Sequence, residues 1–252
     1  MKHKMCTLAA VCILAAVMGN TVLMAQDADD STSPISIVGD IPYVSRYYWR
    51  GSDLSNGDDG FLQPSIDVSY TAASEGSSFT IGANVWYSQG IEDGTAIKDN
   101  SEIDYSAYIG VSVGPADISA GVIDYVIPND TPFAEGDVLE ANVGVSINTL
   151  PFDNNVTFYL NLDGDDDDSA YLAPSVGYTY KSLSFGLTLG LALGESAYYG
   201  TDGTKLIDIT PSVSYAVPFG DNETSISLNI GYNPETDLKI PYITVGTSFS
   251  ID

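Results

Sequence analysis

The chain has 252 residues and a formal net charge of −26, because 34 acidic residues are opposed by only 8 lysines and arginines. A field of this sign repels nucleic acid and anionic lipid headgroups, so nucleic acid is excluded as a partner. Cys6, Cys12 and the single histidine, His3, all lie near the N-terminus. The rest of the chain therefore has no disulfide framework, no thiolate or imidazole metal ligand and no Ser-His-Asp triad, and we do not expect an enzyme.

The first 25 residues have the pattern of a secretory signal peptide. A basic MKHK start precedes a largely apolar run, and Ala25 is a small residue suited to cleavage. The alternative is an uncleaved membrane helix, because about 20 apolar residues can span a bilayer. Gly19, Asn20 and Thr21 interrupt the run, which favours a cleaved signal. The predicted segments are a signal peptide at 1–25, a flexible N-terminal segment at 26–35 and one folded domain at 36–252.

From residue 36 onward, apolar and polar side chains alternate with a period of two. In LSFGLTLGLALG at 183–194, leucine and phenylalanine occupy every second position, opposite serine, threonine, alanine and glycine. Successive side chains of a β-strand point to opposite faces, so each such stretch predicts a strand with one apolar face. Turn signals divide the chain into about twelve strands. The predicted strands are 37–50, 61–73, 78–88, 101–114, 116–127, 137–149, 155–163, 169–181, 183–194, 204–217, 223–233 and 239–251.

Short and long connections alternate between these strands. The tight connections are 74–77, 114–115, 151–154, 181–182 and 218–222, and the longer, acidic ones are 51–60, 89–100, 128–136, 164–168, 195–203 and 234–238. This alternation is typical of an outer-membrane barrel with short periplasmic turns at one end and extracellular loops at the other. An even number of strands places both termini at the short-turn end.

Aromatic residues on the apolar faces are sorted by height. Near the short turns they are Tyr70, Phe79, Tyr178, Tyr180, Phe185, Tyr215 and Phe249, and near the long loops they are Trp49, Tyr87, Tyr105 and Tyr232. Two aromatic bands around an aliphatic belt are typical of a surface that meets lipid, whereas a soluble β-sandwich, the alternative, turns its apolar faces inward. We therefore predict an all-β fold: a single closed antiparallel up-and-down transmembrane β-barrel of about twelve strands in a bacterial outer membrane, with membrane lipid as a partner.

One set of motifs adds a family resemblance. The motifs are Ser45-Arg46-Tyr47 with Arg50-Gly51, then Gln63, Asp67 and Tyr70, then Glu102-Ile103-Asp104-Tyr105. Over residues 43–127 this pattern resembles bacterial putative porins of the TorF type, and the resemblance implies an exported Gram-negative outer-membrane barrel. The chain departs from that family in its DGDDDDS loop. It also ends in Asp252 where many such barrels end in Phe, so Phe249 and Ile251 would be presented to the barrel-assembly machinery.

Arg46 and Arg50 are the only arginines, and they lie four residues apart in the first predicted strand. If Trp49 faces lipid, both arginines point into the lumen. The carboxylates predicted to share that polar face are Asp67, Glu102, Asp104 and Glu140. We favour an ion-pair network that braces the wall, since arginine binds carboxylates bidentately. The alternative is a selectivity constriction across a narrow pore.

The loop LDGDDDDS is the only candidate metal site. Alternating Asp163, Asp165 and Asp167 are similar to the start of a calcium loop, because calcium takes clustered oxygen ligands. Asp168 stands where such a loop needs glycine, which favours a solvated acidic loop. Weak calcium binding at 163–168 is therefore the only cofactor considered.

Two functions are consistent with these features. The first is a porin-like channel for passive diffusion of small hydrophilic solutes, leaning toward cations and neutral molecules because carboxylates line the loops and the lumen. Twelve strands give a modest bore, and Trp86, Tyr108, Tyr159 and Tyr171 share the lumen face. The second is therefore a plugged barrel that acts as a structural or surface-binding protein through its acidic loops.

Overall fold

The computed structural model describes residues 33–55, 60–91, 101–126, 137–219 and 222–251. The predicted signal peptide lies outside these residues, and so does most of the predicted flexible segment, whose last residue, Ile35, already belongs to a strand. None of the described residues forms a helix with the length and hydropathy needed to cross a bilayer.

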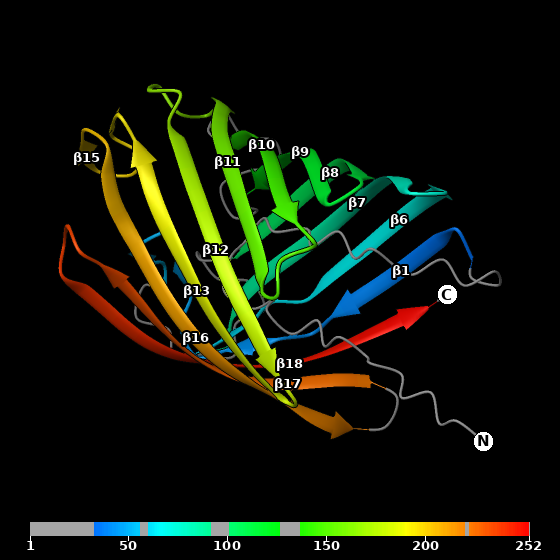
Figure 1. The fold of residues 1–252 in the computed structure, drawn as a ribbon. Coiled ribbons are helices and arrows are strands. Elements are labelled where there is room, and N and C mark those ends of the chain that lie inside the picture. Colours follow the sequence, from blue (N-terminus) through cyan, green and yellow to red (C-terminus); the bar gives the residue numbers. More distant parts are fainter. Residues whose placement is uncertain (1–32, 56–59, 92–100, 127–136, 220–221, 252) are drawn as a thin grey trace, which may run out of the picture.

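The described chain forms a closed antiparallel barrel (Figure 1), which confirms the predicted fold class. Two of its twelve strands are each interrupted once, so that β1 with β2 and β5 with β6 count as one barrel strand each. The barrel strands are β1 Ile35–Asp40 with β2 Tyr43–Val44, β5 Phe61–Leu62 with β6 Ser65–Ser74, β7 Ser77–Gly90, β8 Glu102–Val113, β9 Ala116–Val126, β10 Val138–Ile147, β11 Asp153–Asp163, β12 Ala170–Tyr180, β13 Leu183–Leu193, β16 Lys205–Phe219, β17 Asn222–Asn233 and β18 Leu238–Ile251. Each pairs with its neighbours in chain order, and β1 closes the ring against β18 from Ile37↔Ile251 to Asp40↔Ser248.

The apolar side chains point away from the barrel, as the sequence predicts. On β17, Leu228 has 49% of its side chain exposed, whereas its neighbour Asn229 is 2% exposed and faces the interior. The same division holds around the ring: Val68, Ile81, Ile109 and Phe185 are exposed, and Thr80, Ser184, Ser227 and Thr244 are buried. A soluble β-protein buries its apolar face, so this reversed sidedness is what a barrel in lipid requires.

The aromatic band at the short-turn end is confirmed on the outer surface. Its members Tyr70, Phe79, Tyr178, Tyr180, Phe185, Tyr215 and Phe249 are all exposed. At the long-loop end, Tyr105 is exposed in the same way. Trp49 is not part of the outer band, and the prediction that it faces lipid is wrong.

The first predicted strand, 37–50, ends early, at Val44. Pro42 has no N–H to donate to the sheet. Ser45 then donates its N–H to the Ile243 carbonyl, and its Oγ accepts the Ile243 N–H at 2.9 Å, where a backbone carbonyl would otherwise continue the ladder. Beyond this point the chain leaves the wall and turns inward, which also carries Arg46 and Arg50 off the predicted strand.

A second, two-stranded sheet forms inside the barrel from β3 (Tyr48–Trp49) and β4 (Ser52–Asp53). Arg50 and Gly51 form its two-residue turn with φ of 43° and 86°. Such turns need positive φ at both positions, which Gly51 supplies without strain. We call residues 45–55 the inner hairpin.

If the outer face meets lipid, a charge placed there is costly. We expect Leu228→Arg, at mid-height on β17, to lower the free energy of unfolding in liposomes by about 2 to 4 kcal/mol. Urea titration of the refolded barrel measures it, with Leu228→Ala as the size control. Equal stability of the two variants would contradict a lipid-facing position for Leu228.

Candidate constriction of the barrel lumen

The inner hairpin crosses the interior of the barrel. It leaves the wall at β2, which lies between β18 and β5, and its tip contacts β10, β11, β12, β16 and β17. In the ring order of the described strands, β11 stands halfway round from β1 and β2. A segment that is covalently attached to one wall and docks on the opposite wall must span the lumen.

Arg50 at the tip makes the central contact. Its Nη1 and Nη2 donate to Glu140 Oε2 and Oε1 on β10 at 2.5 and 2.9 Å, and both side chains are 1% exposed. Nη1 also donates to the Tyr199 hydroxyl at 2.7 Å. A bidentate pair of this kind combines charge with fixed geometry, so it sets where the tip lies as well as holding it there.

Aromatic rings surround the Arg50 guanidinium. Its carbon lies 4.1 Å from the ring centre of Tyr159 on β11, 4.7 Å from that of Tyr171 on β12 and 4.8 Å from that of Trp49. Burial is the largest single effect and lowers the pKa of Arg50. The charge of Glu140 and the hydrogen bond to it, together with the nearby Tyr199 and Tyr125, outweigh burial, and the pKa is raised. Arg50 therefore stays charged at the centre of this aromatic cage.

The two tyrosines before the tip reach different walls. Tyr47 donates its hydroxyl to Glu102 Oε2 on β8 at 2.5 Å and packs against Phe61 and Trp86. Tyr48 donates to Asp208 Oδ1 on β16 at 3.0 Å. Hydrogen bonds thus hold the hairpin to two separate parts of the barrel wall, β8 and β16.

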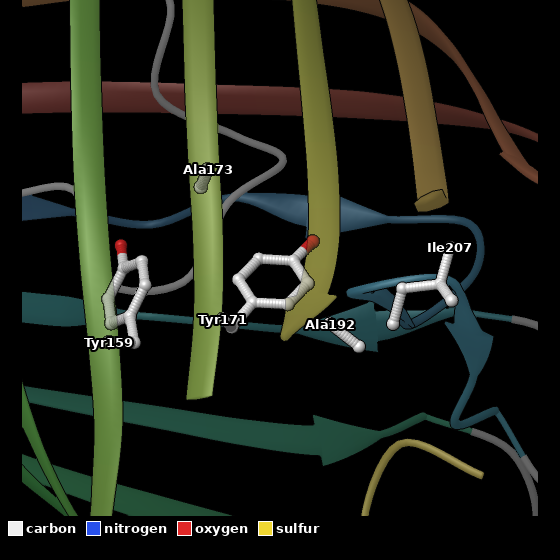
Figure 2. Close-up of a cluster of buried hydrophobic side chains, with 5 residues drawn as sticks. All are labelled: Tyr159, Tyr171, Ala173, Ala192 and Ile207. Atoms are coloured by element: carbon white, nitrogen blue, oxygen red, sulfur yellow. The ribbon is translucent and has the colours of Figure 1, made fainter. Parts of the chain in front are cut away.

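The wall that receives the tip is itself aromatic. Figure 2 shows Tyr159, Tyr171, Ala192 and Ile207 side by side on successive strands, and this cluster is fully buried. Gly190 leaves the space that the Tyr171 hydroxyl occupies, since a Cβ at that position would overlap it. Gly190, on the inner face of β13, therefore makes room for a lumen side chain.

A second segment covers the hairpin from the long-loop end. It lies between β14 (Glu195–Ser196) and β15 (Thr201–Asp202), and it places Tyr198 and Tyr199 on Trp49, with ring centres 6.0 and 6.4 Å apart. The Ser196 hydroxyl lies 2.6 Å from that of Ser169, and Ala197 N donates to Asp167 Oδ2 at 2.7 Å. The covering loop and the loop after β11 are therefore tied together.

The structure brings some of the predicted site residues together and separates others. Arg50, Glu102 and Glu140 all contact the inner hairpin or belong to it, and Asp104, buried next to Glu102 on β8, has an Oδ1 atom without a hydrogen-bond partner. Arg46 is partly exposed at the base of the hairpin.

Asp67 lies nearer the short turns and accepts the Tyr108 hydroxyl at 3.0 and 3.1 Å. It is therefore a lumen residue, as predicted, but it is separate from the constriction. Sequence reasoning missed Tyr47, Tyr48, Trp49, Tyr199 and Asp208; the early signal was Pro42 followed by Ser45, a poor pair for the interior of a strand.

The aspartates of the loop after β11 bind the loop backbone. Asp165 accepts the Ser169 N–H at 2.8 Å, the Asp167 N–H at 3.2 Å and the Asn161 side-chain N–H at 3.0 Å. Burial opposes ionisation, but these hydrogen bonds prevail and lower the pKa of Asp165. Asp163 is exposed and accepts the N–H of Gly164. Within the described ranges, no three His, Cys, Asp or Glu side chains are arranged to hold a metal ion, so the arrangement of Asp163, Asp165 and Asp167 gives calcium binding no support.

Loss of one partner of the Arg50–Glu140 pair should destabilise the barrel strongly. Arg50→Ala leaves a buried carboxylate unpaired, a change that costs about 3 to 5 kcal/mol in comparable cases. We expect a clear loss of thermal stability of the refolded barrel in detergent, followed by circular dichroism. Lys239→Ala is the matched control, because the Lys239–Asp237 pair is exposed and such pairs contribute about 0 to 1 kcal/mol. An Arg50→Ala barrel that melts with the control would show that the pair does not brace the wall.

Comparison with known proteins supports the fold. No curated protein matches the chain. An outer membrane channel from Pseudomonas putida F1 is 8% identical with a TM-score of 0.50, over 90% of this chain and 100% of that one. A chain solved in a study of the in-meso crystallization of membrane proteins is 14% identical with a TM-score of 0.51, over 85% of this chain and 84% of that one. At these identities the likeness concerns the fold alone.

One family model matches residues 28–208, which is more than half of the chain. Its description names no TorF-type porin, so that finer resemblance stays a prediction. The match covers the inner hairpin, Glu102, Glu140 and Asp208 alike. The chain belongs to the family described as "Bacterial protein of unknown function (Gcw_chp)".

Proposed function

We propose that this protein is an outer-membrane channel of the porin type, through which small hydrophilic solutes diffuse past a constriction made by the inner hairpin. The observation that carries the proposal is the docking of Arg50 on Glu140, on the wall opposite the hairpin's attachment. A closed barrel with an apolar outer face and a polar inner face supplies the membrane-spanning wall. Nothing in this arrangement calls for a catalytic residue, and we propose no enzymatic activity.

The inward side chains are packed to different degrees. On β6, β7 and β8, Asp67, Asn84, Ser106 and Tyr108 keep part of their surface accessible. Around the hairpin, Tyr47, Tyr48 and Arg50 are buried. This contrast supports a partly hydrated lumen beside β6 to β8 and a constriction at the hairpin.

Charge at the constriction supports a preference for cations and neutral solutes. Arg50 is neutralised by Glu140, and the other acidic side chains around the hairpin, Glu102, Asp104 and Asp208, make the local field negative when they are ionised. Rings of carboxylates attract cations and repel anions in a narrow, low-dielectric passage. The acidic loops add to this field at the mouth.

The second candidate function is a plugged barrel that acts as a structural or surface-binding protein. The observation that favours it is the packing of the hairpin: Tyr159 and Tyr171 are fully buried beneath Arg50, and Tyr198 and Tyr199 cover it. Under this alternative, the acidic loops carry the function and the lumen serves only stability.

Removal of the hairpin separates the two functions. Val44 and Phe61 are cross-strand partners, so replacing residues 45–60 by Asn-Gly joins them through a two-residue turn that strands accept readily. In planar bilayers we expect small conductance steps from the wild type and larger, long-lived steps from this variant. Lys239→Ala, refolded in the same way, is the control and should match the wild type.

Each other result assigns the function differently. If the wild type is silent and the shortened barrel conducts, the hairpin is a plug and the second candidate holds. Equal conductance of the two would show that the hairpin does not constrict the lumen, and silence from both would argue against any channel.

Selectivity tests the charge argument. Asp104→Asn replaces an acidic group, whose Oδ1 has no hydrogen-bond partner, by an amide of the same shape that cannot ionise, so it should leave the packing intact. We expect the reversal potential of the channel in a KCl gradient to move toward zero, because cation preference falls. Asp237→Asn, on an exposed turn, controls for net charge, and an unchanged reversal potential in Asp104→Asn would place selectivity elsewhere.

A further inference from the structure

The outer surface carries an apolar groove at the short-turn end of β12 and β13. It has a volume of about 430 Å³ and is lined by Phe152, Tyr178 and Phe185 toward the turns and by Val176 and Leu187 further in. A water molecule takes up only about 30 Å³ of liquid volume, so the groove is large enough for many carbon atoms. Because its lining is almost wholly apolar, it suits a hydrocarbon chain.

A lysine lies at the same end of the same hairpin. Lys181 occupies the tight turn between Tyr180 and Leu183, and its Nζ lies 5.3 Å from the ring centre of Tyr180. The Tyr180 ring is exposed on the outer band, so this contact holds the ammonium at the lipid-facing rim.

Lys181 differs from the other described lysines in its partners. Lys205 pairs with Asp202 and Glu235, and Lys239 pairs with Asp237. In the ranges that the structure describes, Lys181 has no carboxylate within ion-pair distance. An unpaired cation is a marked exception in a chain of net charge −26.

The backbone also singles out this position. Lys181 has a φ of 58°, in the left-handed region that glycine and asparagine adopt more easily. A lysine that keeps this conformation supplies a charge at some conformational cost. The acidic loops lie at the far end of the barrel, beyond the Debye length of about 10 Å at 0.1 M salt, so they do little to cancel that charge.

We propose that this surface binds one anionic glycerophospholipid of the membrane leaflet at the short-turn end, with an acyl chain in the groove and the headgroup phosphate at Lys181. The inference rests on the proposed membrane location and adds a specific partner to it. Lysine is a common phosphate ligand, and the exposed tyrosines Tyr178 and Tyr180 place hydroxyl groups at the headgroup level. The phosphate thus meets the Lys181 ammonium at the height where the surroundings of the barrel change from hydrocarbon chains to lipid headgroups.

The test compares two lipids with the same acyl chains. Phosphatidylglycerol or phosphatidylcholine is added to the refolded protein in detergent, and bound lipid is counted by native mass spectrometry. We expect about a fivefold preference for phosphatidylglycerol, the size of one lysine's attraction to an anionic headgroup. Lys181→Gln should abolish the preference, and Lys239→Gln, the matched control, should retain it. Val176→Trp, which fills the groove, should lose both lipids.

The outcomes distinguish this inference from the proposed function. A preference that survives in Lys181→Gln, or that falls equally in Lys239→Gln, would overturn the headgroup contact. Binding that survives in Val176→Trp would overturn the groove. If the barrel inserts into bilayers and conducts but shows either result, only the lipid site fails. If the protein stays monomeric in water without detergent, the membrane function fails with it.

Discussion

The hydrogen-bonding demand of the backbone governs this structure. A sheet with an apolar outer face in lipid has no water to satisfy an open edge, so β1 must close on β18. Closure of twelve strands then encloses a lumen wider than the reach of one side chain from each wall. The polar faces that closure turns inward therefore need either water or another polar segment to fill the space. The inner hairpin is such a segment. It continues from β2, in the same barrel strand that closes the ring against β18.

The same demand explains how the hairpin leaves the wall. When β2 ends at Val44, the Ile243 N–H of β18 loses its backbone acceptor, and Ser45 Oγ takes that place. Within the hairpin, β3 and β4 pair with each other, so their backbone groups are satisfied away from the wall. The positive charge of Arg50 at the tip is then compensated by the carboxylate of Glu140. Backbone pairing thus allows the excursion, and the ion pair fixes its end point.

The period-two pattern predicts most of this fold, because strand side chains face lipid or lumen with little ambiguity. The bounds of the barrel strands from β7 to β18 lie within a few residues of the predicted strands, and Glu102, Asp104 and Glu140 face inward as their parity requires. The pattern fails at residues 45–50 because alternation describes an inner two-stranded hairpin as well as a wall strand. Its turn gives a weak signal, since Arg50 is an unusual residue at positive φ. The same failure placed Trp49 toward lipid, and Asp208 was missed because its partner Tyr48 lies in this hairpin.

Bracing and constriction, which the sequence leaves as alternatives for Arg50, become one contact under the proposed channel function. A brace formed within a strand pair would leave the lumen open, and a constricting arginine without a fixed partner would be drawn to whichever carboxylate of the wall is nearest. Here the partner lies on the opposite wall, so the bond that holds the hairpin also keeps it across the lumen. Buried ion pairs add little net stability over an apolar pair of the same shape, but they are demanding about position. The main role of the Arg50–Glu140 pair is therefore to fix the position of the hairpin in the lumen, that is, its height and its direction. The rings of Trp49, Tyr159 and Tyr171 surround Arg50 and exclude the water that would weaken the bond.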